Sequence, residues 1–298
     1  MSLEINKVHH MNAIDGMSEM DPDCVDMVIT SPPYDNLREY NDSSEWNFNV
    51  FKDIADGLIR VLRPGGVICW NVADAIVEIH KRKGMPKGTS RTGTSFRQCL
   101  YFMDNGLNFH DHIIYEKPAA RFSASAKGNR YSDVFEYCFV LSKGKPDHVN
   151  LIADKKNKGF GTSFTKDGGR NKDGTRNRDA KKTKIAVKEF GVRHNIWKIN
   201  NAYGTAQSNK KAYEHPALMP QQLAKDMIMS YTNEGDLVLD PFMGSGTTAA
   251  VAKSLGRDYI GCELHEDYGN LILKRVEGYH VPIEEVSHNP LTDLLDRV

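Results

Sequence analysis

One stretch near the end of the chain, LVLDPFMGSGTTAAVAKSLGRDYIGCEL, residues 237–264, limits the fold most strongly. Its apolar start predicts a buried strand over residues 236–240, and a glycine-containing loop then leads into a helix over 247–255, which Gly256 ends. A second strand is expected over 259–263. Two strands joined through one helix form a crossover unit, which requires a parallel sheet with helices packed on its faces.

Other segments continue this alternation of strands and helices. The sequence predicts further strands over residues 24–30, 67–72, 112–115 and 134–141, and helices over 48–62, 218–231 and from about 266 onward. The segment RPGG, residues 63–66, is expected to stop the first of these helices before the next strand. The predicted fold class is therefore α/β, with a mainly parallel, doubly wound sheet.

The glycine turn of the crossover unit is a candidate nucleoside site. Gly244 and Gly246 let the backbone approach a ligand closely, and Glu263 follows Gly246 by seventeen residues, at the tip of the next strand. That geometry suits a turn that meets the polar tail of a nucleoside and a carboxylate that accepts its ribose hydroxyls. The spacing is not GxGxxG and no Gly-Lys-Ser/Thr is present, which favours an adenosine-type cofactor without a pyrophosphate. The alternative is a turn that only packs a strand against a helix.

The stretch VITSPPY, residues 28–34, ends a predicted strand with two consecutive prolines and an aromatic residue. Proline has no backbone N–H and stiffens the turn, so we expect carbonyl oxygens here that can accept from an incoming amine. Ser31 adds a hydroxyl acceptor, and Tyr34 supplies a face on which a flat ring can stack. Taken alone, this segment can also be an ordinary turn, and it is the nucleoside site downstream that favours an amine-bearing ring as its ligand.

A basic segment interrupts the α/β pattern. Residues 143–193 hold fifteen Lys and Arg against six Asp and Glu, a net charge of +9 in a chain whose total is zero. Clustered cations gain affinity for nucleic acid by releasing its counterions, whereas the alternative is a solvated, partly disordered loop. The candidate nucleic-acid-binding residues are Lys155, Lys156, Lys158, Arg170, Arg176, Arg178, Lys181 and Lys182.

Composition places the chain among globular proteins, because 40% of its 298 residues are hydrophobic and 26% are charged. The five cysteines lack CxxC spacing, which argues against a zinc cluster or a disulfide framework and predicts a cytoplasmic protein. No metal is expected. No signal sequence and no apolar run of about 18 residues is apparent, so we expect neither secretion nor a membrane span.

The pairing of ITSPPY with DPFMGSGTT resembles the DNA amino-methyltransferases, which move a methyl group from S-adenosyl-L-methionine to an exocyclic nitrogen of a DNA base. Three more segments are similar to family segments: HIIYEKP at residues 112–118, FEY at 135–137 and HPALMP at 215–220. The order of catalytic turn, basic insert and cofactor turn is similar to that of the β group, in which the insert recognises the target.

The resemblance implies a Rossmann-like methyltransferase domain in two parts. Residues 1–142 would form its catalytic part, residues 143–195 the basic target-recognition insert and residues 196–298 its cofactor-binding part. The residues implied to hold the base are Ser31, Pro32, Pro33 and Tyr34. Those implied in the cofactor site are Asp240, Phe242, Gly244, Ser245, Gly246, Thr247, Glu263, His215 and Pro216.

The form Thr-Ser-Pro-Pro-Tyr is similar to enzymes that act on cytosine N4, whereas Asp at the position of Ser31 is commoner among those that act on adenine N6. We therefore expect a site-specific cytosine-N4 methyltransferase of double-stranded DNA, in restriction-modification or in host or phage DNA modification. Adenine N6 is the alternative, and RNA, protein or a non-catalytic DNA-binding role are remoter ones. The target base should leave the duplex before direct methyl transfer. Dimers are common in the resembling group, so a homodimer is a candidate assembly.

Overall fold

The computed structural model describes residues 3–33, 46–79, 88–117, 130, 131, 133–166, 172, 173, 175, 183–199, 219–265 and 276. Contacts divide the chain into two compact units. Unit 1 holds the described residues between 1 and 150 and between 195 and 282, and unit 2 holds those between 151 and 194.

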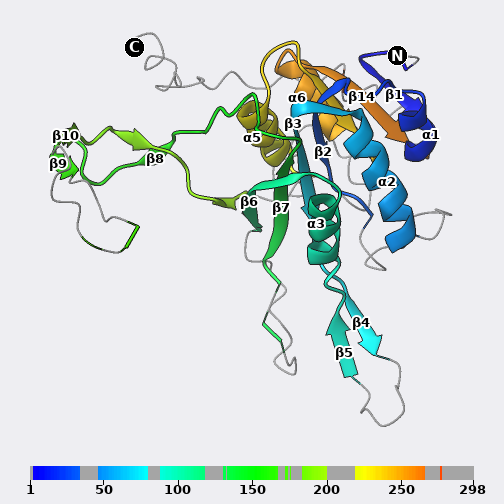
Figure 1. Cartoon of the computed structure of the whole chain (residues 1–298), viewed down its shortest axis with the longest axis horizontal. Coiled ribbons are helices and arrows are strands. Elements are labelled where there is room, and N and C mark those ends of the chain that lie inside the picture. Colours follow the sequence, from blue (N-terminus) through cyan, green and yellow to red (C-terminus); the bar gives the residue numbers. More distant parts are fainter. Residues whose placement is uncertain are drawn as a thin grey trace. The chain divides into compact units, whose positions relative to one another are not determined.

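Unit 1 is built on an eight-stranded sheet with the order β1-β14-β13-β2-β3-β7-β6-β12 (Figure 1). Five strands from β1 to β3 run parallel, β7 is antiparallel to both of its neighbours, and β12 is parallel to β6. Its strands are β1 (Lys7–His10), β2 (Val25–Thr30), β3 (Leu62–Val72), β6 (Asn108–Glu116), β7 (Phe135–Ser142), β12 (Ile196–Lys198), β13 (Leu237–Asp240) and β14 (Asp258–Glu263). The predicted α/β class with a mainly parallel sheet is confirmed.

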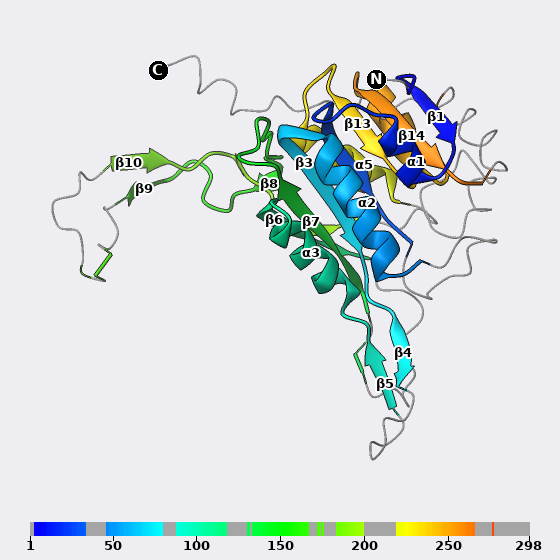
Figure 2. The same ribbon diagram turned by 45° about the vertical axis from the view of Figure 1, so that its right-hand side comes forward.

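Helices cover both faces of this sheet. On one face lie α1 (Ala13–Ser18), α2 (Phe48–Val61) and α3 (Thr94–Asp104) (Figure 2). These helices bury a cluster that includes Phe51, Trp70 and Phe102. On the other, α5 (Gln221–Tyr231) and α6 (Thr247–Ser254) pack on the strand residues of opposite parity, such as Met27 and Cys69. Because side chains alternate along a strand, each inner strand serves both cores, which explains their nearly continuous apolar sequences.

Three predicted boundaries were wrong: β6 begins at Asn108 and not at 112, and the other two differences have identifiable reasons. Strand β3 begins at Leu62, not after RPGG, because a register shift against β2 takes Arg63–Gly66 into the strand as a bulge. Gly66 is needed there, since a Cβ at this position would lie 2.8 Å from the Asp26 carbonyl oxygen. Helix α5 begins at Gln221, not at 218, because Pro220 is its extended N-cap and disfavours helical geometry at Met219.

The short strands lie in two-stranded ladders. Within unit 1, β4 (Ile76–Ile79) pairs with β5 (Gly88–Arg91). Unit 2 contains β8 (Lys155–Lys156) paired with β11 (Phe190–Gly191), and β9 (Ser163–Lys166) paired with β10 (Thr183–Ala186). The insert therefore has secondary structure that its polar sequence did not indicate, because nearly all of these strand residues are solvent-exposed and no apolar alternation is required.

The helix expected from about residue 266 lies outside the described residues, except for the buried Val276. No helix in the described ranges is long and apolar enough to cross a membrane.

Candidate active site

The two sequence motifs meet at one edge of the sheet. Strands β2 and β13 are parallel neighbours, with Val28 opposite Leu239, so the turns that follow them leave the sheet side by side. The chain runs from β2 through α2 to β3 on one side, and from β13 through α6 to β14 on the other. Such a switch in direction opens a crevice at the carboxyl ends of the strands, which is where open α/β sheets bind ligands.

The first turn follows β2 directly. Ser31 and Pro33 are half-buried and Pro32 is buried, which places the predicted Ser-Pro-Pro turn at the rim of the crevice. Tyr34 lies outside the described residues, as do His215 and Pro216. Their predicted roles stay predictions.

The second turn requires glycine at two positions. Gly244 has φ 53° and Gly246 has φ 80°, a left-handed conformation that side chains with a Cβ rarely adopt. Gly246 is the N-cap of α6, and no side chain of the described residues caps this helix. The first amides of α6 therefore remain available to an anionic group such as a carboxylate. Ser245 and Thr247 are buried within the turn.

Asp240 braces the two turns against each other. Its carboxylate accepts from Thr30 Oγ1 at 2.6 Å, from Thr248 Oγ1 at 2.6 Å and from the Phe242 amide at 3.0 Å. Thr30 is the last residue of β2, and Thr248 belongs to α6. Burial raises the pKa of Asp240 to about 6, although the three hydrogen bonds act in the opposite direction. The predicted contact of Asp240 with a cofactor stays a prediction, since these contacts show a bracing role.

Glu263 holds the glycine turn from the neighbouring strand. One carboxylate oxygen accepts from the Gly244 amide at 2.7 Å and the other accepts from the His265 amide at 3.0 Å. The backbone adds a bond from the Met243 amide to the Cys262 carbonyl at 2.9 Å. An ionised carboxylate has about four acceptor sites, so these two bonds leave it able to accept from ligand hydroxyls.

Aromatic side chains flank the crevice. Phe242 packs edge-on against Trp46, with ring centroids 5.5 Å apart.

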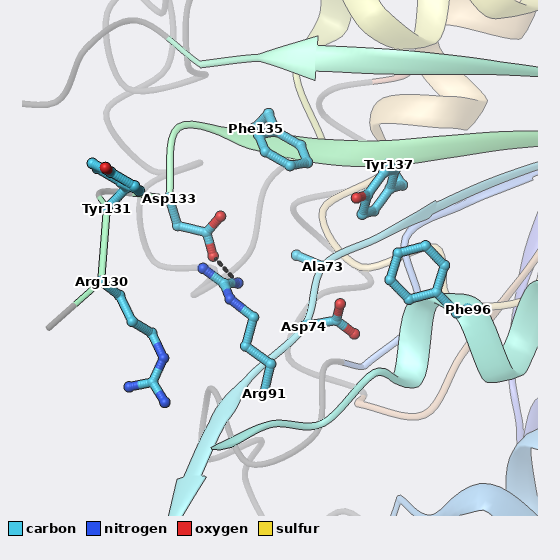
Figure 3. Close-up of a pocket in the computed structure, with 9 residues that line it drawn as sticks. All are labelled: Ala73, Asp74, Arg91, Phe96, Arg130, Tyr131, Asp133, Phe135 and Tyr137. Carbon is cyan, nitrogen blue, oxygen red and sulfur yellow. Dashed lines mark hydrogen bonds and ion pairs between the residues drawn. The ribbon is translucent and has the colours of Figure 1, made fainter. Parts of the chain in front are cut away.

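A separate pocket of about 480 Å³ opens where β3 ends and β7 begins (Figure 3). It is lined by Ala73, Asp74, Arg91, Phe96, Arg130, Tyr131, Asp133, Phe135 and Tyr137. Figure 3 shows Phe96, Phe135 and Tyr137 on one side and the Arg91–Asp133 ion pair, at 2.6 Å, on the other.

The predicted DNA-binding residues are only partly described. Lys155, Lys156 and Lys158 are exposed on unit 2, and so are Phe160 and Phe164. The others lie outside the described residues: Arg170, Arg176, Arg178, Lys181 and Lys182.

Four of the five cysteines are buried and Cys24 is half-buried. All five are free, and burial raises the pKa of each thiol, that of Cys99 to about 11 and that of Cys262 to about 12. In the described ranges, no three His, Cys, Asp or Glu side chains group together as metal ligands would.

Sequence reasoning missed Thr30 and Thr248 as parts of the site. Both hydroxyls donate to Asp240, and one of them comes from 210 positions away in the chain. The available signal was their position inside the two motifs, ITSPPY and DPFMGSGTT.

Comparison with known proteins agrees with this geometry. The family model described as DNA methylase matches residues 25–274. The orphan methyltransferase M.BamHII of Bacillus amyloliquefaciens is 46% identical over 265 residues, which cover 88% of this chain and 93% of that protein. The type II methyltransferase M.SmaI of Serratia marcescens is 26% identical over 292 residues, covering 89% and 88% of the two chains.

Solved structures share the fold. The PvuII DNA methyltransferase, described as cytosine-N4-specific, matches with a TM-score of 0.62 and 19% identity, covering 98% of this chain and 91% of that one. A complex of M1.HpyAVI with S-adenosyl-L-methionine matches with a TM-score of 0.54 and 20% identity, covering 91% and 98%. That complex contains S-adenosyl-L-methionine, the cofactor predicted for this chain. With its two motifs in one crevice and a family model that spans most of its length, this chain belongs to the DNA methylase family.

Proposed function

We propose that this protein is a site-specific DNA methyltransferase that transfers a methyl group from S-adenosyl-L-methionine to N4 of a cytosine rotated out of the duplex. The observation that carries the proposal is the bracing of the Ser31 turn against the glycine turn through Asp240. This arrangement fits a reaction in which an acceptor amine and a methyl donor must be held at neighbouring strand ends.

The glycine turn fits the cofactor. The uncapped N-terminus of α6 suits the carboxylate of the methionine part, and the left-handed Gly244 and Gly246 allow close approach of the backbone. Glu263, at the tip of β14, would accept from the ribose hydroxyls. S-adenosylmethionine would supply an electrophilic methyl group in this crevice.

The Ser-Pro-Pro-Tyr turn would hold the base. An exocyclic amine conjugated to a ring is a poor nucleophile, and hydrogen bonds from its NH₂ to Ser31 and to the Pro32 carbonyl would localise its lone pair. Tyr34 would supply the stacking face. Ser31, where adenine-N6 enzymes more often have Asp, favours cytosine, and the cytosine-N4-specific PvuII enzyme shares the fold. Adenine N6 remains the alternative.

Unit 2 would contact the DNA backbone. Its exposed Lys155, Lys156 and Lys158 suit phosphates, and its exposed Phe160 and Phe164 suit stacking on bases. Such contacts offset the few kcal/mol that rotating a nucleotide out of the duplex costs. The relatives include both an orphan enzyme and type II enzymes, so a role with or without a partner nuclease is compatible with the family.

A cytoplasmic homodimer fits the remaining features. The free cysteines suit a reducing compartment. On α3, Phe96, Leu100 and Met103 are 52%, 55% and 40% exposed at positions i, i+4 and i+7, a stripe that a second copy could cover. Sedimentation of the wild type and of Leu100→Glu tests this: a dimer that becomes monomeric supports the surface, and a wild-type monomer contradicts it.

The acceptor is tested with tritiated S-adenosylmethionine and unmethylated genomic DNA, total RNA and a protein extract as separate substrates. We expect label in DNA alone, and loss of this label in Tyr34→Ala while cofactor binding persists. Label in RNA or protein would overturn the DNA assignment. Cofactor binding without transfer to DNA of any sequence would indicate a non-catalytic DNA-binding module.

A further inference from the structure

Four polar residues stand in a row across four neighbouring strands, at the edge of the sheet where the active site lies. Ser31 follows β2, Asn71 is next to the last residue of β3, Glu136 is the second residue of β7 and Lys117 follows β6. Strand parity places all four on the α5/α6 side, because neighbouring residues of the same parity, such as Ile29 and Cys138, belong to the core on that face.

Direct contacts join these residues into one chain of interactions. Lys117 Nζ lies 2.5 Å from Glu136 Oε1, and Glu136 Oε2 accepts from Asn71 Nδ2 at 2.8 Å. Asn71 Nδ2 also lies 3.5 Å from Ser31 Oγ, at the outer limit of a hydrogen bond. Such contacts are often long before a substrate binds and tighten in the complex.

Glu136 fixes which way the Asn71 amide points. An ionised carboxylate can only accept, so Asn71 must turn its NH₂ group toward it, and the amide oxygen then accepts from Cys138 Sγ at 2.9 Å. The second hydrogen of the NH₂ group is thereby directed to the side of Ser31. With its amide reversed, Asn71 would present an oxygen to Glu136 and repel it.

Burial strengthens this arrangement. Asn71 is 5% exposed, and the Glu136 side chain is 12% exposed. Hydrogen bonds to a charged group are shorter and stronger than neutral ones, and a low local dielectric increases the difference. Lys117 balances the charge of the Glu136 carboxylate through the ion pair between them.

We propose that Glu136 and Asn71, supported by Lys117, are positioning residues that hold the Ser31 hydroxyl in its orientation toward the target base. This inference rests on the role given to Ser31 in the proposed function. None of the three is required to touch the base, and each acts through Ser31.

The test compares Glu136→Gln with wild type in methyl transfer at saturating DNA and cofactor. Gln can flip and has no charge to pair with Lys117, so the orientation of Asn71 is no longer enforced. We expect kcat to fall by up to about a hundredfold, which is what a misplacement of about 1 Å can cost. The cofactor Kd should not change, because the glycine turn is untouched. Asn71→Leu, of similar shape, should behave alike.

A matched control and a double variant separate positioning from general loss of structure. Glu116→Gln removes an ion pair with Lys198 (3.2 Å) at the same sheet edge without touching Asn71, and should leave kcat unchanged. In a Ser31→Ala background, Glu136→Gln should add no further loss, because the group it positions is gone.

The results separate the positioning inference for Glu136 and Asn71 from the proposed function. If Ser31→Ala lowers kcat but Glu136→Gln does not, or if the two losses multiply in the double variant, the positioning inference is wrong while the proposed function stands. If Ser31→Ala retains full activity, the role of Ser31 in the proposed function fails, and the inference fails with it.

Discussion

Thr30→Val should destabilise the protein more at pH 8 than at pH 5. The change removes the hydroxyl that donates to the buried Asp240 at 2.6 Å and nearly preserves the shape of the side chain. Asp240 has a pKa raised from 3.8 to about 6 in the folded protein. The folded state therefore binds the proton more tightly, and the stability that Asp240 contributes is complete below pH 3.8 and lost as pH rises through about 6.

In Thr30→Val, the stability that Asp240 contributes continues to fall up to a higher pH than in the wild type. The Thr30 hydrogen bond lowers the pKa of Asp240, so its removal raises that pKa further. At pH 5 the carboxyl is mostly protonated, and the lost bond is worth about 1 kcal/mol, as for a neutral pair. At pH 8 the carboxylate is charged and buried with one donor fewer, which costs about 2–3 kcal/mol.

Urea unfolding of the cofactor-free protein at both pH values measures the two differences. Working without cofactor avoids the stability that a bound ligand adds. Ser142→Ala is the matched control, because its buried hydroxyl donates to the neutral Gly144 carbonyl at 2.8 Å and its loss should cost the same at both pH values. An equal destabilisation by Thr30→Val at pH 5 and pH 8, or a larger one at pH 5, would refute the assigned role of Asp240.

Three further predictions concern the cofactor turn and the insert. Gly246→Ala forces a residue with a Cβ to adopt a φ of 80°, so the free energy of unfolding, measured in urea, should fall by about 1–2 kcal/mol. An unchanged value would contradict the left-handed turn. In Glu263→Gln the side chain has one acceptor oxygen and no charge, so it cannot accept from both the Gly244 and the His265 amides. The Kd for S-adenosylmethionine, measured by calorimetry, should rise about tenfold, and wild-type affinity would contradict the role of Glu263. Replacing Lys155, Lys156 and Lys158 by Ala should weaken DNA binding and reduce the slope of log K against log salt by about 0.9 for each phosphate that is no longer neutralised; an unchanged slope would remove these lysines from the DNA interface.

The elements predicted best from sequence were those with two strong local signals. Strand β13, the glycine turn and α6 were expected nearly as observed, because an apolar strand, left-handed glycines and the terminating Gly256 agree with one another. Elements without such signals were missed. Both faces of the β9–β10 ladder are solvent-exposed, so its sequence has no apolar alternation. The start of β3 at Leu62 depends on the close approach of Gly66 to Asp26 on another strand.

The motifs likewise predicted residues of the candidate site, but they did not predict the contacts between those residues. Ser31 and Gly246 could be singled out from their turns, but the pairing of Thr30 with Asp240 joins residues 210 positions apart. The contact between Asn71 and Glu136 depends on β7 running antiparallel beside β3. Neither relationship has a fixed spacing in the chain, because both arise from strand order.

The most direct test of the account is mass spectrometry of nucleosides from unmethylated DNA treated with the protein and labelled S-adenosylmethionine. We expect label in N4-methylcytosine. Label in N6-methyladenine would preserve the crevice and its chemistry but contradict the base assigned to the Ser31 turn, and label in 5-methylcytosine would contradict direct transfer to an exocyclic amine.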